Sequence, residues 1–288
     1  MLYTFPLLVF ISCLKTVTLE FDEFHHNPVV NCLLVPDSVI KVHLSLSAPA
    51  DGDELFPDLS GAKVEISDGK KALELIHTGS GYYQTPELPQ PGKAYSLKVT
   101  LDNNVLLKSE TKIPVKPDIK ITSLPDRNLA KVTISDKPEE QNFYWVGIKI
   151  FIKNSESYQY ETYFFTNLLL FDDFNRTQGN GIIEGIRYSY HFYARLEDQS
   201  FNGEEISFYT PRKWPEPDDN IDYVFILYII NADEHLDKYM KSAILQYELG
   251  VVGDMPVFHT PISIYSNIEN GKGIFGSYTL SEFDISRP

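Results

Sequence analysis

Apolar and polar residues alternate in short stretches between residues 28 and 115. In the clearest stretch, residues 38–47, every second residue is apolar and would lie on one face of a β-strand: Ile40, Val42, Leu44 and Leu46. Turn signals such as Asp68 with Gly69 and Pro91 with Gly92 separate this stretch from others of the same kind. Short strands with turns at this spacing predict a small β-sandwich over residues 28–115.

Two prolines, Pro114 and Pro117, mark the expected boundary between two domains, because proline favours extended backbone and lacks a backbone donor. Strand patterns resume beyond the prolines, and we expect a second, larger β-sandwich over residues 118–288. Its expected strands span residues 119–124, 130–135, 144–152, 187–196 and 223–231. Abundant Val, Ile, Thr, Tyr and Phe also favour strands. The predicted fold class is mainly all-β.

One helix is predicted at about residues 233–249. Its apolar residues recur at helical spacing, namely Leu236, Tyr239, Met240, Ala243, Ile244 and Tyr247. Asn231 and Glu234 resemble a capping box at its start, and Gly250 would close it. The polar face carries charges of both signs, so the helix is expected to pack one face on the second sheet rather than to lie on a membrane.

The N-terminus has the character of an export signal. Residues 1–12 are uncharged and contain an apolar run too short to span a bilayer, and the small Ser12 directly precedes Cys13. We interpret residues 1–12 as a signal peptide, Cys13 as a lipid-attachment site and residues 13–27 as the anchor and tether. This predicts attachment to a membrane through the lipid on Cys13.

Charge and cysteine content narrow the range of partners. The formal net charge is -15, which disfavours nucleic acid because phosphate contacts need clustered Lys and Arg. The second of the two cysteines, Cys32, lies in an apolar run and is expected to be buried. A disulfide framework or a structural zinc site does not follow from this count.

The sequence patterns that could indicate a catalytic or metal site are all weak matches. Residues 271–276 match the glycine spacing G-x-G-x-x-G, but only twelve residues follow, too few for the helix and acidic residue that a dinucleotide site needs. His25 and His26 are better explained as part of a hydrated tether than as metal ligands. Adjacent carboxylates such as Asp172 with Asp173 are expected on solvated faces. We therefore predict no catalytic residues, no metal and no cofactor.

Several segments carry a resemblance to a known family. These segments are residues 30–33, 42–47, 61–68, 81–83, 92–97 and, most specifically, 264–276. They resemble a family of Bacteroidota lipoproteins that is catalogued as a domain of unknown function. The last segment resembles the closing signature of that family and is interpreted as a structural turn, with Asn267, Asn270, Gly271, Gly273 and Gly276 as its characteristic residues.

The resemblance implies an outer-membrane lipoprotein whose genes often neighbour TonB-dependent receptors. It also implies a first domain similar to immunoglobulin-like or carboxypeptidase-regulatory-like domains, and it carries no catalytic residues over. We expect a non-enzymatic protein, anchored by palmitate-type lipid at Cys13 on the periplasmic face or the cell surface, that binds a ligand or partner beside such a receptor. Two alternatives stay open: an envelope hydrolase acting on glycan or peptide, and a surface adhesin or structural module.

Overall fold

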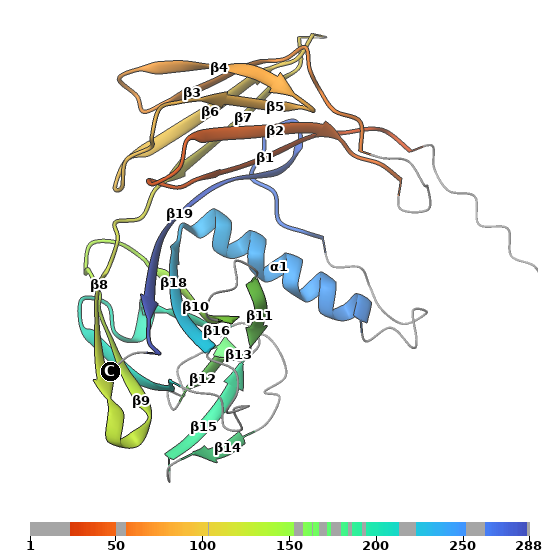
Figure 1. Ribbon diagram of the computed structural model, residues 1–288. Helices are drawn as coiled ribbons and strands as arrows, with labels where there is room; N and C mark the ends of the chain where they lie inside the picture. The colour runs from red at the N-terminus through yellow and green to blue at the C-terminus, as the bar shows by residue number, and fades with distance from the viewer. Residues whose placement is uncertain are drawn as a thin grey trace, which may run out of the picture.

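The computed structural model describes residues 24–49, 56–102, 104–152, 158–162, 164–166, 172–173, 180–183, 186–191, 194–212, 223–251 and 263–286. Cys13 and the expected signal peptide lie outside these ranges. The described chain is mostly β with a single α-helix, which confirms the predicted fold class (Figure 1). No helix within the described ranges is long and apolar enough to cross a membrane.

The N-terminal unit contains seven strands and the first half of the last strand of the chain, β19 (Lys272–Asp284). The seven are β1 (Pro28–Leu34), β2 (Ile40–Leu46), β3 (Lys63–Ser67), β4 (Ala72–Gly79), β5 (Tyr82–Thr85), β6 (Ala94–Thr100) and β7 (Leu106–Lys112). They follow the order β19-β1-β2-β5-β4-β3-β6-β7. The first half of β4 pairs with β3 and its second half with β5, so β4 connects the two layers of strands.

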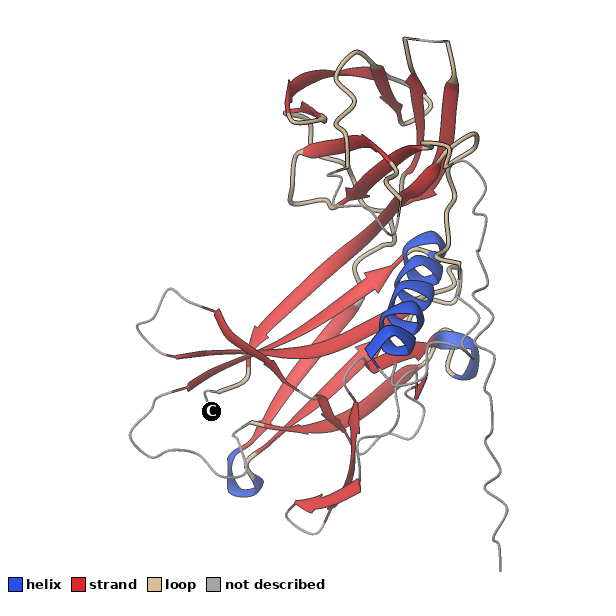
Figure 2. Cartoon of the chain, turned by 90° about the vertical axis from the view of Figure 1, so that its right-hand side faces the viewer, coloured by secondary structure: helices blue, strands red, loops and turns tan. Residues whose placement is uncertain are grey.

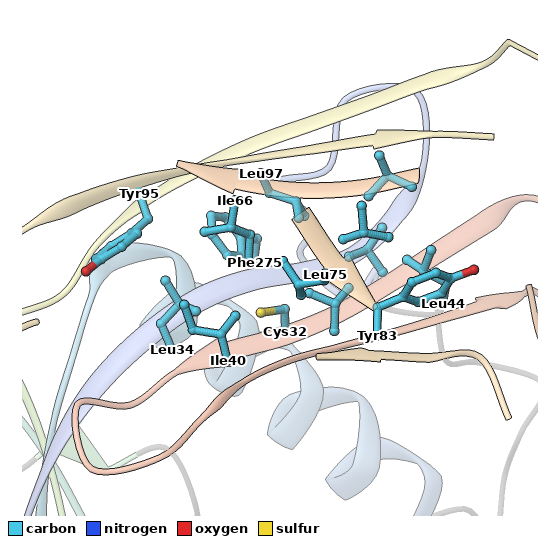
Figure 3. Packing of buried hydrophobic residues seen from close by; sticks show 14 of the residues in the cluster. Cys32, Leu34, Ile40, Leu44, Ile66, Leu75, Tyr83, Tyr95, Leu97 and Phe275 are labelled. Atoms are coloured by element: carbon cyan, nitrogen blue, oxygen red, sulfur yellow. The ribbon is translucent and has the colours of Figure 1, made fainter. Parts of the chain in front are cut away.

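The predicted alternation accounts for the core of this unit. Buried apolar side chains from every second position, including Ile40, Leu44, Ile66 and Leu97, lie between the two layers of strands (Figure 3). Cys32 is among them at 2% exposure, as predicted, and burial raises the pKa of its thiol. Each such side chain contributes roughly 1.5–3 kcal/mol when it leaves water.

The second unit contains the remaining strands, the second half of β19 and the helix α1 (Glu234–Val251). The strands are β8 (Asp118–Leu124), β9 (Leu129–Ser135), β10 (Phe143–Ile152), β11 (Tyr158–Thr162), β12 (Phe164–Thr166), β13 (Asp172–Asp173), β14 (Asn180–Ile183), β15 (Ile186–His191), β16 (Ala194–Glu197), β17 (Glu205–Pro211) and β18 (Tyr223–Ala232), with 3-10 turns at Pro125–Arg127 and Asp198–Ser200. One sheet has the order β13-β16-β10-β18-β19, and β11 also pairs with β10. A smaller sheet has the order β17-β9-β8.

The larger sheet of this unit is covered on both faces. One face shares an apolar core with the small β17-β9-β8 sheet. This core includes Tyr144 and Val146 of β10 and Phe208 of β17. Helix α1 lies over the other face (Figures 1 and 2). Its residues Leu236 and Ile244 belong to one apolar cluster with Trp145 of β10. The predicted packing of the helix on the second sheet is therefore confirmed.

Strand β19 joins the two units. Its first six residues pair in parallel with β1, and its last seven pair antiparallel with β18. The predicted second domain includes residues 267–277, whereas in the structure these residues hydrogen-bond to β1 and β7 of the first unit. The parallel partner of β1 thus comes from the far end of the chain, and local alternation holds no information about such a pairing.

The segment before β19 covers the free edge of β7. The Glu269 amide donates to the Lys108 carbonyl (2.9 Å), and the Asn270 side chain donates to the Leu106 carbonyl (3.0 Å). The Ser109 hydroxyl donates to the Asn267 carbonyl at 2.9 Å. Because the same segment continues along β1, the described strand edges at β7 and β1 are both covered.

The five residues of the expected closing turn have different roles. Asn270 has a φ of +60° and forms a turn with Gly271. The side chain of Asn267 pairs with the backbone of Phe275 through two hydrogen bonds, of 2.8 and 3.0 Å. Gly273 and Gly276 lie inside β19 rather than in the turn, which corrects the sequence interpretation.

Close packing explains the two glycines inside the strand. Gly273 has a φ of +104°, and a Cβ atom there would lie 2.0 Å from the carbonyl oxygen of Val30. A Cβ atom on Gly276 would lie 3.2 Å from the Cβ of Leu236 in α1. These glycines allow β19 to approach β1 and the helix closely.

Candidate functional site

A groove of about 330 Å³ lies where the two units meet. Three segments form it: the end of β7 with the linker that follows, the loop between β9 and β10, and the first turn of α1. Its lining residues are Lys112, Pro114, Glu139, Glu140, Gln141, Phe143, Asp233, Glu234 and His235. Junctions between structural units are common places for ligand sites, so this groove is the candidate site.

Asp233 fixes the start of the helix at the floor of the groove. Its Oδ1 accepts hydrogen bonds from the amides of Leu236 (2.8 Å) and Ser277 (3.1 Å), and its Oδ2 accepts one from the Thr111 hydroxyl. The carboxylate therefore ties α1 to β19 and β7. Asp233 is the N-cap, which corrects the expected capping box of Asn231 and Glu234, because Asn231 belongs to β18.

Burial governs the acidity of Asp233. The side chain is removed from solvent, and this desolvation raises its pKa, although the donors from Thr111, Leu236 and Ser277 oppose the shift. Its capping bonds and the positive end of the α1 dipole favour the charged form. Desolvation is the larger effect, so the pKa of Asp233 is raised from its ordinary value.

The acidic groups at the rim are mostly paired. Glu140 accepts a hydrogen bond from Lys112 Nζ at 2.6 Å, and although burial opposes it, this contact and the Val115 amide keep the pKa of Glu140 below its ordinary value. Lys238 Nζ donates to Glu234 Oε1 and lowers the pKa of Glu234. Glu139 has no ion-pair partner in the described part of the chain. The groove therefore offers one unpaired carboxylate together with the polar groups of Gln141 and His235.

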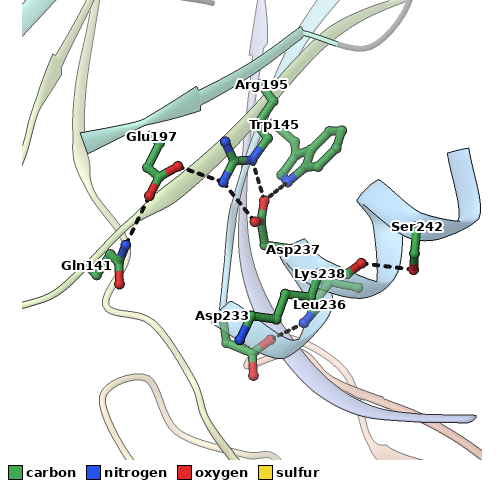
Figure 4. Close-up of polar contacts among 9 residues, drawn as sticks. All are labelled: Gln141, Trp145, Arg195, Glu197, Asp233, Leu236, Asp237, Lys238 and Ser242. Atoms are coloured by element: carbon green, nitrogen blue, oxygen red, sulfur yellow. Dashed lines mark hydrogen bonds and ion pairs between the residues drawn. The ribbon is translucent and has the colours of Figure 1, made fainter. Parts of the chain in front are cut away.

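A buried charge network lies behind the groove, between the sheet and α1 (Figure 4). The guanidinium of Arg195, 1% exposed, donates from Nε to Asp237 Oδ1 (2.6 Å) and from a terminal nitrogen to Asp237 Oδ2 (2.8 Å). Trp145 Nε1 donates to the same Oδ1 at 3.0 Å. Glu197 accepts from both Arg195 (3.1 Å) and Gln141 (3.0 Å), which connects the network to the groove wall.

A second polar network supports the loop between β9 and β10. The Tyr144 hydroxyl donates to Asp136 at 2.6 Å, and the Asn142 amide donates to Asp198 at 2.8 Å. Burial is the main cause that raises the pKa values of Tyr144 and Asp198. Asp136 and Asp198 are only 8% and 2% exposed and do not line the groove. Their chemistry is that of structural acceptors that hold the loop.

The candidate residues from the sequence do not assemble into this site. Cys13 is outside the described residues, and Asn267 to Gly276 lie along β1 and β7. His26 lies at the tether end of the first unit, where Nδ1 contacts the Ser47 carbonyl at 2.7 Å. In the part of the chain that the structure describes, no cluster of three or more His, Cys, Asp or Glu is arranged to hold a metal.

Sequence reasoning missed the groove and the Arg195 network. Three segments far apart in the chain form the groove, and alternation within each one does not show that they meet. For the network there was one signal: Arg195 and Trp145 sit in predicted strands, where a charge or indole on the buried face needs a partner. The partner, Asp237, belongs to the buried face of the predicted helix.

These features define a mainly β protein of two units that share one strand, with one helix covering the second sheet. The chain belongs to the family described as a domain of unknown function, DUF4249, whose model matches residues 15–283. The resemblance to a family of unknown function is thus confirmed.

Other comparisons add little. No match to a curated protein was found. Among solved structures, a cytokine receptor complex matches with a TM-score of 0.26 and 9% identity, covering 69% of this chain and 89% of the other. A proposed carbohydrate-binding protein from Bacteroides uniformis matches with a TM-score of 0.20 and 10% identity, covering 72% and 89%. Scores this low carry no functional meaning.

Proposed function

We propose that this chain is a non-enzymatic, lipid-anchored protein of the outer membrane that binds a ligand or partner beside a TonB-dependent receptor. The observation that carries the binding role is the junction groove, whose walls come from both units. Asp233 and β19 hold these walls together, so the groove is preorganised, and preorganisation reduces the entropic cost of binding. The unpaired Glu139 and the polar Gln141 and His235 provide hydrogen-bonding groups for a polar ligand.

The anchor is assigned to Cys13. The support is the uncharged apolar run before it and the tether that leads to β1. Several acyl chains hold a protein on a membrane stably, whereas one alone binds marginally. We expect the Cys13→Ala variant to lose palmitate labelling and to leave the membrane fraction.

Cys32→Ala is the matched control, because Cys32 is buried in the first core and cannot carry lipid there. That variant should remain membrane-bound and labelled. If Cys13→Ala stays in the membrane pellet as firmly as the wild type, the anchor proposal is wrong.

The partner is tested by purification from membranes under mild solubilisation. A TonB-dependent receptor should co-purify with the wild type and be reduced with Glu139→Lys, which reverses the unpaired charge in the groove. Glu110→Lys, on the exposed face of β7, should leave recovery unchanged. Recovery of no such receptor with the wild type would contradict the partnership, and equal recovery with Glu139→Lys would exclude the groove as the contact.

One observation favours the envelope hydrolase as a second candidate. Glu140 and Asp233 line the same groove, and their pKa values are shifted in opposite directions. Such a pair can divide general acid and base roles. However, Lys112, Thr111 and three backbone amides already donate hydrogen bonds to these carboxylates. Hydrolysis of envelope glycan or peptide by the wild type, lost in Glu140→Gln, would support this candidate over the binding role.

A further inference from the structure

A second pocket lies at one end of the first unit, where β1, β3 and β7 begin and where β2 and β6 end. Its volume is about 340 Å³. The candidate groove adjoins the other end of β7, and a strand of seven residues spans roughly 20 Å. Pockets that hold small ligands begin at about this volume. The pocket is therefore separate from the groove and suits a small molecule.

The inner lining of this pocket is apolar. Four of its half-buried side chains pack against the core of the first unit: Leu59, Ala62, Leu101 and Val105. Pro28 and Leu46 are also half-buried and complete the apolar lining. Covering such a surface releases water from it, which favours binding. The pocket therefore favours a ligand with an apolar body.

Two exposed polar side chains, Asp102 and His26, stand at the rim of the pocket. Within the described residues, Asp102 forms neither an ion pair nor a hydrogen bond. Its carboxylate lies against the backbone of Gly61, where a Cβ atom would be only 2.2 Å from Oδ2. Glycine at position 61 therefore leaves room for the carboxylate at the pocket wall.

His26 offers a second acceptor at the rim. Its Nδ1 donates to the Ser47 carbonyl at 2.7 Å, so in the neutral ring Nε2 carries no hydrogen and accepts. Neither Lys nor Arg is among the described residues that line the pocket. The hydrogen-bond donors, and any positive charge, must therefore come from the ligand.

Hydrogen bonds hold the pocket walls in place. The Tyr83 hydroxyl donates to the Leu59 carbonyl at 3.0 Å and accepts from the Ala62 amide at 3.1 Å, which fixes one wall. At the rim, the Ser47 amide donates to the Asn27 carbonyl at 2.8 Å and fixes the chain beside His26. Walls that are held in advance reduce the entropic cost of binding.

We propose that this pocket binds a small molecule in which a primary ammonium group is joined to a short aliphatic or aromatic body. The body covers the apolar lining, and the ammonium group donates to the Asp102 carboxylate and to His26 Nε2. An ammonium group carries three donors and a positive charge, which match these two acceptors. Asp102 would repel an anion, and a sugar would place hydroxyl groups against the apolar lining without partners. The inference goes beyond the proposed function and uses a different site.

The test is a titration at neutral pH, followed by NMR of the Leu and Val methyl groups in the full-length chain. The probes are hexylamine, hexan-1-ol and hexanoate, which share a six-carbon chain and differ in charge. We expect hexylamine to cause saturable shifts at Leu59, Leu101 and Val105. It should bind about fivefold more tightly than hexan-1-ol, because Asp102 is exposed and exposed ion pairs contribute modestly. Hexanoate should bind more weakly than either.

Asp102→Asn removes the charge and keeps the shape of the side chain. The affinity for hexylamine should fall about fivefold, to that for hexan-1-ol, because the ion pair is lost. The affinity for hexan-1-ol should stay the same. The matched control is Asp37→Asn, an exposed carboxylate in the turn between β1 and β2 at the opposite end of the same unit. Both positions are exposed, so both variants should fold, and the control should bind hexylamine as the wild type does.

Any of four results would overturn the inference: no saturable shift at the pocket methyl groups with hexylamine, equal affinity for hexylamine and hexan-1-ol, hexylamine affinity insensitive to Asp102→Asn, or an equal loss in Asp37→Asn. These measurements involve neither a TonB-dependent receptor nor Glu139. Failure of the amine site is therefore distinguishable from failure of the proposed function.

Discussion

The two units of this protein treat their strand edges in opposite ways. In the first unit, residues 267–277 run along β7 and then along β1, so that a remote segment covers both edges. In the second unit, β8 remains unpaired on one side among the described residues. An edge that is covered resists association, and an edge that is open permits it. The described edges of the first unit are therefore closed, whereas the second unit keeps one described edge without a strand partner.

The units also differ in what lies inside them. The first unit is held by a continuous cluster of apolar side chains between its layers. The second has an apolar core as well, but it also buries the Arg195–Asp237 pair and the carboxylates of Asp136 and Asp198. Buried charges stabilise only with their partners in place. The second unit should therefore be the more sensitive to single polar substitutions.

Arg195→Met should produce the largest effect. It leaves the Asp237 carboxylate buried without its guanidinium, and breaking a buried pair in this way costs about 3–5 kcal/mol. Chemical denaturation followed by signals from each unit should show the second unit unfolding first. The double variant Arg195→Met with Asp237→Leu should recover most of the loss. If the single variant is as stable as the wild type, the pair does not hold α1 on the sheet.

Gly273→Ala tests the closure of the first unit. The added methyl group meets the Val30 carbonyl, and φ is positive, so β19 must move away from β1. We expect the free energy of unfolding to fall by about 2 kcal/mol or more, because a strained backbone and a steric clash combine. Amide hydrogen exchange should accelerate in β1 before it does in β10.

Gly69→Ala is the control for this substitution. Gly69 also has a positive φ, of +81°, but no atom lies within 4 Å of the position that a Cβ atom would take there. Gly69→Ala should lower the free energy of unfolding by about 1 kcal/mol, because only the left-handed backbone conformation is strained. Equal losses in the two variants would show that contact with β1 is unimportant.

Local patterns in the sequence account for much of this fold. Alternation predicts β2, β3 and β6 because a strand repeats every two residues, and helical spacing predicts α1. It also predicts the burial of Cys32. Contacts between remote segments were not predictable in this way: the pairing of β1 with β19, the meeting of Arg195 with Asp237, and the groove. Glycines 273 and 276 resemble turn glycines in sequence, and only the approach of Val30 and Leu236 shows their role.

A pH experiment examines the point where the two units meet. Burial raises the folded-state pKa of Asp233 above the unfolded value of about 3.9. Between those two pKa values the folded state binds a proton that the unfolded state does not, so this group makes the protein less stable as pH rises through that window. Asp233→Asn keeps an N-cap and removes the titration.

The free energy of unfolding should be measured for both proteins at several pH values from the ordinary carboxyl range upward. As pH increases, the free energy of unfolding of the wild type should fall relative to that of Asp233→Asn. The other carboxylates are the same in both proteins, so their contributions cancel in this comparison. A pH-independent difference would mean that Asp233 does not titrate differently in the folded protein.

The smallest effect is expected at an exposed pair on the same sheet as Arg195. Lys149 Nζ lies 2.8 Å from Glu282 Oε1, nearly the same separation as in the buried pair, but both side chains are partly exposed to solvent. Water already solvates these charges, so Glu282→Gln should cost about 0.5 kcal/mol or less. Denaturation of this variant beside Arg195→Met compares a buried, bidentate ion pair with a partly exposed pair that has a single contact of similar length. If Glu282→Gln were as damaging as Arg195→Met, burial would not explain the sensitivity of the second unit, and the contrast with the first would need another cause.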